Sequence, residues 1–191
     1  MRIDGKRDIE DAPTYLLGGG VVLREATSAD WLELNERMRP ADRAELAVFG
    51  MRREDPANWE RAWAVFLKGA LVGVLGYVTP CGFGPLSTVR YMGFMSTDAV
   101  ERAKVGFVRA TPRVARFYEA NLPAWVDTVV AIPMASYRGS VEWQRRVLGF
   151  ERTGEVEING TPHAVLAVAR ETLRGADGRR ARNGNGKGAE Q

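Results

Sequence analysis

The chain has 191 residues, of which 45% are hydrophobic and 27% are charged, a composition typical of a soluble globular protein. This length corresponds to one domain, or two at most, and it suffices to bury a core without disulfide bonds. The single cysteine, Cys81, excludes an intrachain disulfide framework and a zinc ribbon. The single histidine, His163, excludes a two-histidine metal site. We therefore expect no metal cofactor.

The formal charge of +3 and the isoelectric point near 9.2 point at first to an anionic partner. Residues 172–191, however, hold 5 basic and 2 acidic side chains, so the remaining 22 basic and 22 acidic residues cancel. This glycine- and arginine-rich tail has one large aliphatic residue, Leu173, and is predicted to be disordered. It either makes weak contacts with nucleic acid or only keeps the protein soluble, and the second reading is the simpler one.

The sequence shows neither a signal peptide nor a convincing membrane span. The first eleven residues mix both signs of charge and contain no apolar run. Residues 69–89 carry no charge over the length of a membrane span, but Pro80, Pro85 and several glycines favour a strand followed by a loop. We expect a cytoplasmic protein with no membrane segment.

In the first half of the chain, residues 1–20 are expected to form an N-terminal extension that ends at a run of three glycines. Ser28 is a candidate helix N-cap, Pro40 fits the start of a second helix, and Lys68-Gly69 fits a hairpin turn. We expect a strand at 21–26, helices at 28–38 and 40–49, and a helical turn at 55–59. A hairpin of strands 63–67 and 71–78 and a further strand at 89–95 are expected to follow.

In the second half, residues 96–110 are expected to form a linker, and Thr111-Pro112 is expected to begin a helix that Pro123 ends. The strong turn pair Asn159-Gly160 predicts a final hairpin. The other expected elements are a central strand at 126–132 and a helix at 138–148 that stops before Gly149. The strands of the final hairpin are expected at 151–157 and 163–169. Residues 21–171 are thus predicted to form one α/β domain, with a mixed sheet of about 6–7 strands flanked by about 4 helices.

This order of elements resembles the GNAT (Gcn5-related N-acetyltransferase) fold over residues 21–170. The most specific match is an apolar helix that ends in Leu148-Gly149-Phe150. A closer similarity, to GNAT-like proteins of tailed phages such as the internal virion protein A type of podoviruses, covers residues 90–150. Its pieces are Thr97-Asp98, Phe107-Val108-Arg109, Asn121-Leu122, Val126-Asp127 and Ser140 with Trp143.

The resemblance implies binding of acetyl-CoA, but the diphosphate-binding loop of the family is altered. The family pattern Arg/Gln-x-x-Gly-x-Gly/Ala corresponds to residues 105–112, which hold one glycine, Gly106. Arg109 and Arg113 either replace the lost backbone contacts or are ordinary surface arginines. If the strands splay at residues 94–96, the backbone N–H groups of Phe94, Met95 and Ser96 are expected to bind the thioester oxygen and the pantetheine arm.

The catalytic residues of the family transfer only in part. The tyrosine that it places four residues before Gly149 corresponds to Arg145, so Tyr137 is the substitute general acid, or else a packing or capping residue. Asp98 is the best-placed carboxylate for proton uptake, with a turn or capping role as the alternative. Glu25 is another candidate base. His163 is expected on the strand surface, and a catalytic pair with Cys81 is not favoured.

Three functions are compatible with these observations. The first is a phage-type acetyl-CoA-dependent N-acyltransferase that acts on a small-molecule or protein amine by direct attack. The second is an inactive GNAT-like virion or assembly protein that contacts other phage virion proteins. The third is a bacterial acetyltransferase with a divergent loop. The expected location is the host cell cytoplasm, or the virion for the second function.

Overall fold

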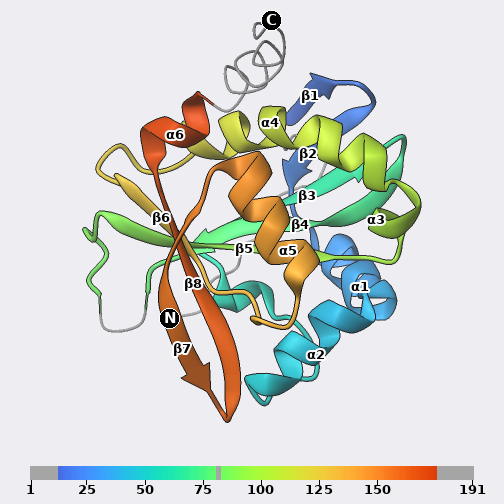
Figure 1. Ribbon diagram of the computed structural model, residues 1–191. Coiled ribbons are helices and arrows are strands. Elements are labelled where there is room, and N and C mark those ends of the chain that lie inside the picture. Colours follow the sequence, from blue (N-terminus) through green and yellow to red (C-terminus); the bar gives the residue numbers. More distant parts are fainter. Residues whose placement is uncertain (1–12, 81–82, 176–191) are drawn as a thin grey trace, which may run out of the picture.

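A computed structural model describes residues 13–80 and 83–175. Eight strands form one mixed sheet, in the order β1-β2-β3-β4-β5-β6-β8-β7 (Figure 1). All neighbouring strands are antiparallel except β5 and β6, which are parallel. The strands are β1 Thr14–Gly18, β2 Val21–Glu25, β3 Arg61–Leu67, β4 Ala70–Val78, β5 Val89–Ser96, β6 Thr128–Ala131, β7 Glu151–Ile158 and β8 Thr161–Ala169.

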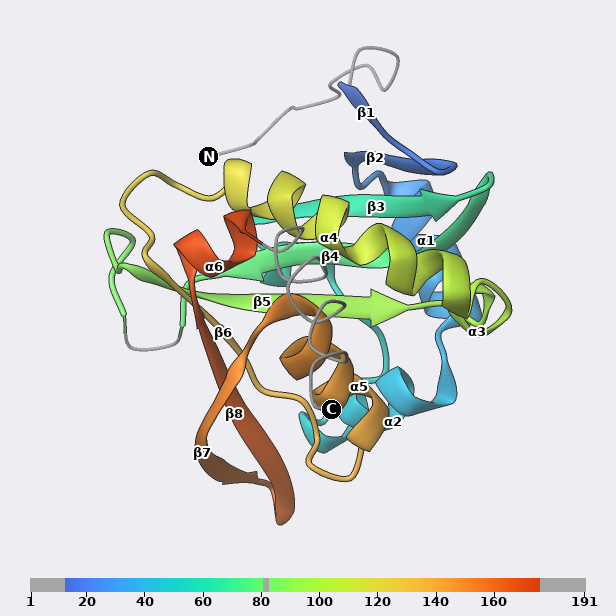
Figure 2. The same cartoon turned by 45° about the horizontal axis from the view of Figure 1, so that its top comes forward.

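Helices cover both faces of this sheet, with α4 and α5 on one side (Figures 1 and 2). The α-helices are α1 Ser28–Arg37, α2 Pro40–Val48, α3 Ala99–Arg102, α4 Lys104–Ala120, α5 Arg138–Trp143 and α6 Arg170–Arg174. A short 3-10 turn, η2, spans Pro56–Asn58. The end of α5 widens into a π-helical turn, η3, over Gln144–Leu148, where the Gly149 N–H bonds the Gln144 carbonyl. Gly149 ends it in the left-handed conformation expected of a C-terminal glycine.

Two apolar cores lie on opposite faces of the sheet, because side chains of a strand alternate between faces. On β3, Trp63 packs into the core beneath α4, whereas its neighbour Ala64 packs into the core beneath α1 and α2. The central strand β4 is buried at every position from Leu71 to Tyr77. This explains the uncharged stretch in the sequence as a strand covered on both faces. Within the described ranges, no helix is long and apolar enough to cross a membrane.

The two hairpins are confirmed with their predicted turns. Lys68-Gly69 and Asn159-Gly160 all have positive φ, the backbone that two-residue hairpin turns require. The predicted helices from Ser28 and Pro40 are also confirmed. The N-cap of α1 is Thr27 rather than Ser28. It forms a capping box with Asp30, and this second polar group decides which residue caps the helix.

The structure adds a strand within the expected N-terminal extension. Residues 14–18 form β1, which pairs with β2 in a hairpin. Gly18, Gly19 and Gly20 all have positive φ, so the glycine run is a tight turn between paired strands. The sheet therefore has one strand more than the upper expectation. Residues 1–12 of the expected extension lie outside the described residues.

The expected linker at residues 96–110 is wrong. Helices α3 and α4 begin there, and Pro112 lies inside α4. Proline removes one helical hydrogen bond, a cost of about 3 kcal/mol. This cost is offset because α4 buries apolar side chains on both sides of the proline, with Phe107 before it and Val114 and Tyr118 after it. The Thr111 hydroxyl also donates to the Phe107 carbonyl at 2.9 Å.

The expected disorder of residues 172–191 is wrong at its beginning. Thr172, Leu173 and Arg174 belong to α6, and Leu173 is fully buried at 0% exposure. Arg174 and Arg170 both bind the Glu119 carboxylate of α4, at 2.7 and 2.8 Å. The aliphatic residue that looked isolated in the sequence is therefore an anchor for the last helix. Residues 176–191 lie outside the described part of the chain.

The expectation of a surface position for His163 is also wrong, since this residue is 0% exposed. The segment after β6 covers it through a bridge with Met134, and the ring of Phe49 lies 5.9 Å from the imidazole. Its Nδ1 lies 2.8 Å from the Thr161 carbonyl, and its Nε2 has no hydrogen-bond partner. Cys81 lies outside the described residues, so the disfavoured pair of the two residues stays untested.

Candidate active site

The parallel strands β5 and β6 separate near the middle of the sheet. They pair from Val89–Thr128 to Tyr91–Val130, after which β5 continues to Ser96 while β6 ends at Ala131. The chain beyond β6 turns toward β8, where the Ala135 N–H donates to the Pro162 carbonyl at 2.9 Å. A cavity of about 310 Å³ opens where the strands diverge.

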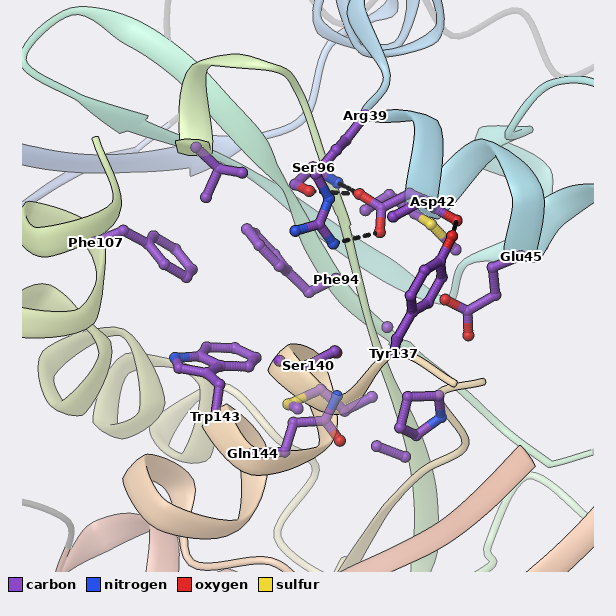
Figure 3. Close-up of a pocket in the computed structure, with 18 of the residues that line it drawn as sticks. Arg39, Asp42, Glu45, Phe94, Ser96, Phe107, Tyr137, Ser140, Trp143 and Gln144 are labelled. Carbon is purple, nitrogen blue, oxygen red and sulfur yellow. Dashed lines mark hydrogen bonds and ion pairs between the residues drawn. The ribbon is translucent and has the colours of Figure 1, made fainter. Parts of the chain in front are cut away.

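The two sides of this cavity differ in chemistry (Figure 3). One side is aromatic: Phe94 of β5 stacks on Phe107 of α4, with ring centroids 5.1 Å apart and an interplanar angle of 14°. Trp143 of α5 lies 5.6 Å from Phe107 and completes this group. The other side is polar, and Asp42 and Glu45 of α2 meet Tyr137 there. The aromatic rings exclude water from one end, while the other end holds charge.

Among the three backbone N–H groups expected to bind an acyl donor, two are already engaged. The Ser96 N–H donates to Asp42 Oδ2 at 2.9 Å. Because the backbone N–H groups of successive strand residues point in opposite directions, the Met95 N–H faces β4, where Met95 pairs with Val74. The same alternation directs the Phe94 N–H toward the cavity, beyond the last pair of β5 with β6. Phe94 thus provides the backbone donor that faces the open space.

A buried ionic network joins α2 to β5. Asp42 is 4% exposed and accepts hydrogen bonds from both the N–H and the hydroxyl of Ser96. Its other oxygen binds Arg39 Nη2 at 3.0 Å, and Arg39 Nη1 binds Glu101 at 3.2 Å. Both oxygens of the buried Asp42 carboxylate are therefore hydrogen-bonded, which is the condition for burying its charge at acceptable cost, whereas Glu101 lies at the surface.

Glu45, one helical turn after Asp42, is a cavity residue that sequence reasoning missed. Burial raises the pKa of its carboxyl to about 7, and the neighbouring Asp42 charge contributes; a hydrogen bond from the Met134 N–H and the charge of Arg39 oppose the shift. Within residues 13–80 and 83–175, no ion pair is formed by Glu45. Its only sequence signal was the spacing of three from Asp42 on a short helix, which by itself is common on solvated helices.

Gln144, the first residue of η3, is a second residue that the sequence did not single out. It lines the cavity from the side of α5 and is only 8% exposed. Its side-chain Oε1 is buried without a hydrogen-bond partner. Unpaired buried acceptors are uncommon in folded proteins, and π-helical turns frequently occur at functional sites.

Tyr137 lies in the cavity wall at the N-cap of α5 (Figure 3). Its hydroxyl donates to the Ala41 carbonyl at 2.6 Å. Burial raises the pKa of this phenol, with further contributions from the Asp42 and Glu45 charges. This hydrogen bond links α5 to α2. Tyr137 thus occupies the packing and capping position that the sequence indicates as the alternative to a catalytic role. A role as general acid stays a prediction.

Asp98 lies outside the cavity lining. It sits between α1 and α3, where Arg37 Nη2 and Arg102 Nη1 lie 2.8 and 2.9 Å from its oxygens. The hydrogen bond from Arg102 and that from Arg37 lower the pKa of this carboxyl. Its side chain is 49% exposed. Glu25, the other candidate base, is exposed at the end of β2.

The residues expected to bind the diphosphate lie along α4 rather than in a loop. Gly106 is in the first turn, and a Cβ there would approach Leu67 Cδ2 at 3.1 Å, so a small residue fits this contact with β3. Arg109 and Arg113 follow on the exposed face. Arg113 lies over the β1–β2 turn, with Nη1 3.1 Å from the Cβ position of Gly19. None of the three lines the cavity.

The described part of the chain contains no ready set of side-chain ligands for a metal ion. No group of three or more His, Cys, Asp or Glu side chains is placed there to hold a metal ion. The polar side of the cavity offers carboxylates, a phenol and an amide, which suit proton transfer and the binding of an amine.

Neither a known protein family nor a curated protein matches this sequence, but many solved structures share its fold. The aminoglycoside acetyltransferase AAC(6')-Ib in complex with coenzyme A has a TM-score of 0.60 and 19% sequence identity, covering 85% of this chain and 99% of that one. The ribosomal-protein-S5-alanine acetyltransferase from Vibrio fischeri has a TM-score of 0.55 and 17% identity, covering 83% and 97%. The spermidine/spermine N-acetyltransferase SpeG from Vibrio cholerae has a TM-score of 0.56 and 13% identity, covering 82% and 97%. The chain therefore has the fold of the GNAT acetyltransferases.

Proposed function

We propose that the protein is an N-acyltransferase that moves an acetyl group from acetyl-CoA to an amine. The observation that carries this proposal is the cavity between the diverging strands, toward which the N–H of Phe94 points and whose lining includes Glu45. The similar AAC(6')-Ib structure is a complex with coenzyme A, which supports acetyl-CoA as the donor.

The residues present fit the reacting end of such a donor. Bound acetyl-CoA supplies an acetyl group activated as a thioester. The Phe94 N–H is placed to polarise a carbonyl oxygen in the cavity, as one donor of an oxyanion hole. The aromatic group of Phe94, Phe107 and Trp143 excludes water and so favours the amine over hydrolysis.

For the diphosphate end, we propose the N-terminus of α4. The first N–H groups of a helix of 17 residues attract anions. Lys104 in the first turn also lines the cavity, and Gly106 lies in the same turn. Arg109 and Arg113, farther along the exposed face, stay proposed as outer contacts.

A second candidate is an inactive GNAT-like assembly protein of a phage, located in the host cytoplasm or the virion. The observation in its favour is that the expected loop at residues 105–112 is helical and includes Pro112. Arg145, at the position counted for the family's tyrosine, pairs with Glu142 at 3.1 Å. The phage-encoded branch rests on the sequence resemblance alone.

Calorimetric titration with acetyl-CoA tests the first candidate against the second. We expect a dissociation constant in the micromolar-to-millimolar range, where substrate affinities commonly lie. Lys104→Gln should weaken binding about 2–5-fold through the lost charge at the helix N-terminus. Arg53→Gln is the matched control, because it also removes one positive charge but lies exposed outside the cavity lining. No heat of binding at millimolar acetyl-CoA would reject the enzyme and leave the assembly role.

A further inference from the structure

Helix α2 forms one wall of the cavity and is fastened along its whole length to the segment after β6 and to the β7–β8 turn. Three hydrogen bonds, one at each successive turn of the helix, make this contact, which we call the α2 seam. They run from the Tyr137 hydroxyl to the Ala41 carbonyl at 2.6 Å, from the Met134 N–H to the Glu45 carboxyl group, and from Asn159 Nδ2 to the Val48 carbonyl at 2.6 Å. Figure 3 shows Tyr137 directed at α2, with Glu45 beside it.

The segment after β6 is held on its other flank as well. Its Ala135 N–H donates to the Pro162 carbonyl at 2.9 Å, and its Pro133 carbonyl accepts from the Ala164 N–H at 3.0 Å. The segment is therefore bonded to β8 on one side and to α2 on the other. It fills the gap that opens where β6 ends, so the cavity is closed on the side of α2.

An extended polypeptide cannot pass through this seam. Such a chain needs about 4.8 Å in the plane of its backbone, the distance between neighbouring strands, and about 10 Å across its side chains. The seam brings donor and acceptor atoms to 2.6 Å at both of its ends. Its positions 41, 45 and 48 are four and three residues apart, which is the spacing of one helical turn. A chain that entered between α2 and the segment after β6 would therefore have to break these bonds.

The exposed residues of the cavity lining mark its mouth on another side. In the described part of the chain they are Glu101 of α3, Lys104 in the first turn of α4 and Gly139 in the first turn of α5. Lys104 is also the residue proposed for the diphosphate of the donor, so the donor fills this mouth during the reaction. An acceptor with a long chain trailing out of the mouth would collide with it. The cavity volume of about 310 Å³ is at the small end for ligand sites.

We propose that the α2 seam restricts the acceptor to small-molecule amines and excludes polypeptides. This inference rests on the proposed acyl transfer. It decides a question that the fold leaves open, because similar structures are named for an aminoglycoside in one case and for a ribosomal protein in another. In this chain a small amine is enclosed in the cavity together with the thioester end of the donor, whereas a polypeptide needs an opening that the seam closes.

The first test compares two acceptors that present the same reacting group. L-Alaninamide and a ten-residue peptide that begins with alanine both offer the α-amine of an alanine, so the comparison reports size alone. With acetyl-CoA and the wild-type protein, we expect kcat/KM for alaninamide to exceed that for the peptide at least about tenfold, because an amine held outside the cavity is misplaced for attack. Equal or faster acetylation of the peptide would overturn the size limit.

A double variant tests whether the seam sets this limit. Tyr137→Phe with Asn159→Gly removes its two outer hydrogen bonds, and glycine keeps the positive φ of position 159. The alaninamide-to-peptide ratio of kcat/KM should fall at least about threefold, because the seam opens more readily without these bonds. A change in kcat cancels in this ratio. Tyr15→Phe with Asn121→Ala is the matched control, since Asn121 Nδ2 also donates to a carbonyl, at 2.8 Å, but lies outside the cavity lining. An unchanged ratio in the seam variant would refute the role of the seam.

Calorimetry separates this inference from the proposed function. Because the seam and the mouth lie on different sides of the cavity, the seam variant should bind acetyl-CoA within about twofold of the wild type. A loss of affinity beyond that would show that the seam shapes the donor site, and would overturn its assignment to acceptor entry. Acetyl-CoA binding to the wild type together with equal turnover of the two acceptors would reject the size limit alone. No acetyl-CoA binding to the wild type would reject the acyl transfer itself.

Discussion

Replacing Glu45 by glutamine should stabilise the fold at high pH and have little effect on it at low pH. The substitution keeps the size and shape of the side chain but removes its charge. Burial favours the protonated carboxyl in the folded protein, with a pKa of about 7 against an ordinary value of 4.5. Above pH 7 the wild type must therefore keep an unfavourable charge in the cavity wall, whereas the variant does not.

The sign follows from proton linkage. Between pH 4.5 and 7 the folded wild type binds more protons at this site than the unfolded chain does, so its free energy of unfolding falls as pH rises. The full shift corresponds to about 3–4 kcal/mol at about 1.4 kcal/mol per pKa unit. Because Glu45 is only partly buried, we expect about half of this, a gain of about 1–2 kcal/mol for Glu45→Gln at pH 8.5.

Urea denaturation of wild type, Glu45→Gln and Glu36→Gln at pH 4 and pH 8.5 measures this difference. Titrations shared by the three proteins cancel when variants are compared with wild type at the same pH. Glu36→Gln, which removes an exposed charge, should differ from wild type by a few tenths of a kcal/mol at both values. An equal effect of Glu45→Gln at both pH values, or a loss of stability at pH 8.5, would show that the carboxyl is not desolvated as described.

Three further predictions follow from the fold. Asp42→Ala should lower the free energy of unfolding by about 2–3 kcal/mol, because it leaves the Ser96 N–H without its acceptor and removes one of the two carboxylates that bind Arg39; urea denaturation measures this, and a loss below about 1 kcal/mol would contradict it. Gly76→Ala should cost about 1–3 kcal/mol by the same assay, since its Cβ would clash with the Arg61 carbonyl oxygen, whereas Gly84→Ala, with open space around it, should be nearly neutral. Removing residues 176–191 should abolish salt-sensitive DNA binding in a gel-shift assay and leave the melting temperature unchanged, because most of the net charge lies in that segment; persistent binding would place the contact on the folded domain.

Local signals in the sequence were sufficient where the structure depends on a few neighbouring residues. The pairs Lys68-Gly69 and Asn159-Gly160 fixed both hairpins through their positive φ values. The same rules misled where packing outweighs local preference. Pro112 predicted a helix start, but the helix continues through it because apolar contacts on both sides compensate for the lost hydrogen bond. The glycine run at residues 18–20 indicated a break, although glycines equally form the turn of a hairpin.

The site was predictable along the backbone and less so in its side chains. The resemblance placed Phe94 and Ser96 beside the diverging strands, and Tyr137 also lies in the cavity. That the Ser96 N–H is occupied depends on Asp42, which is 54 positions away in the chain. The environment of Glu45 likewise depends on the contact of α2 with the segment after β6. No spacing rule within one element reports such contacts.

The π-helical turn changes how positions in this helix correspond to those of related proteins. The Gly149 N–H bonds the Gln144 carbonyl, five residues back instead of four. Counting four residues back from Gly149 leads to Arg145, which is paired with Glu142, but the residue one full turn below the glycine is Gln144, which lines the cavity. A count along the sequence therefore selects Arg145, whereas the hydrogen bonding of the helix places Gln144 one turn below the glycine. An amide at that place holds no acidic proton, so in the proposed acyl transfer Gln144 would not protonate a departing thiolate.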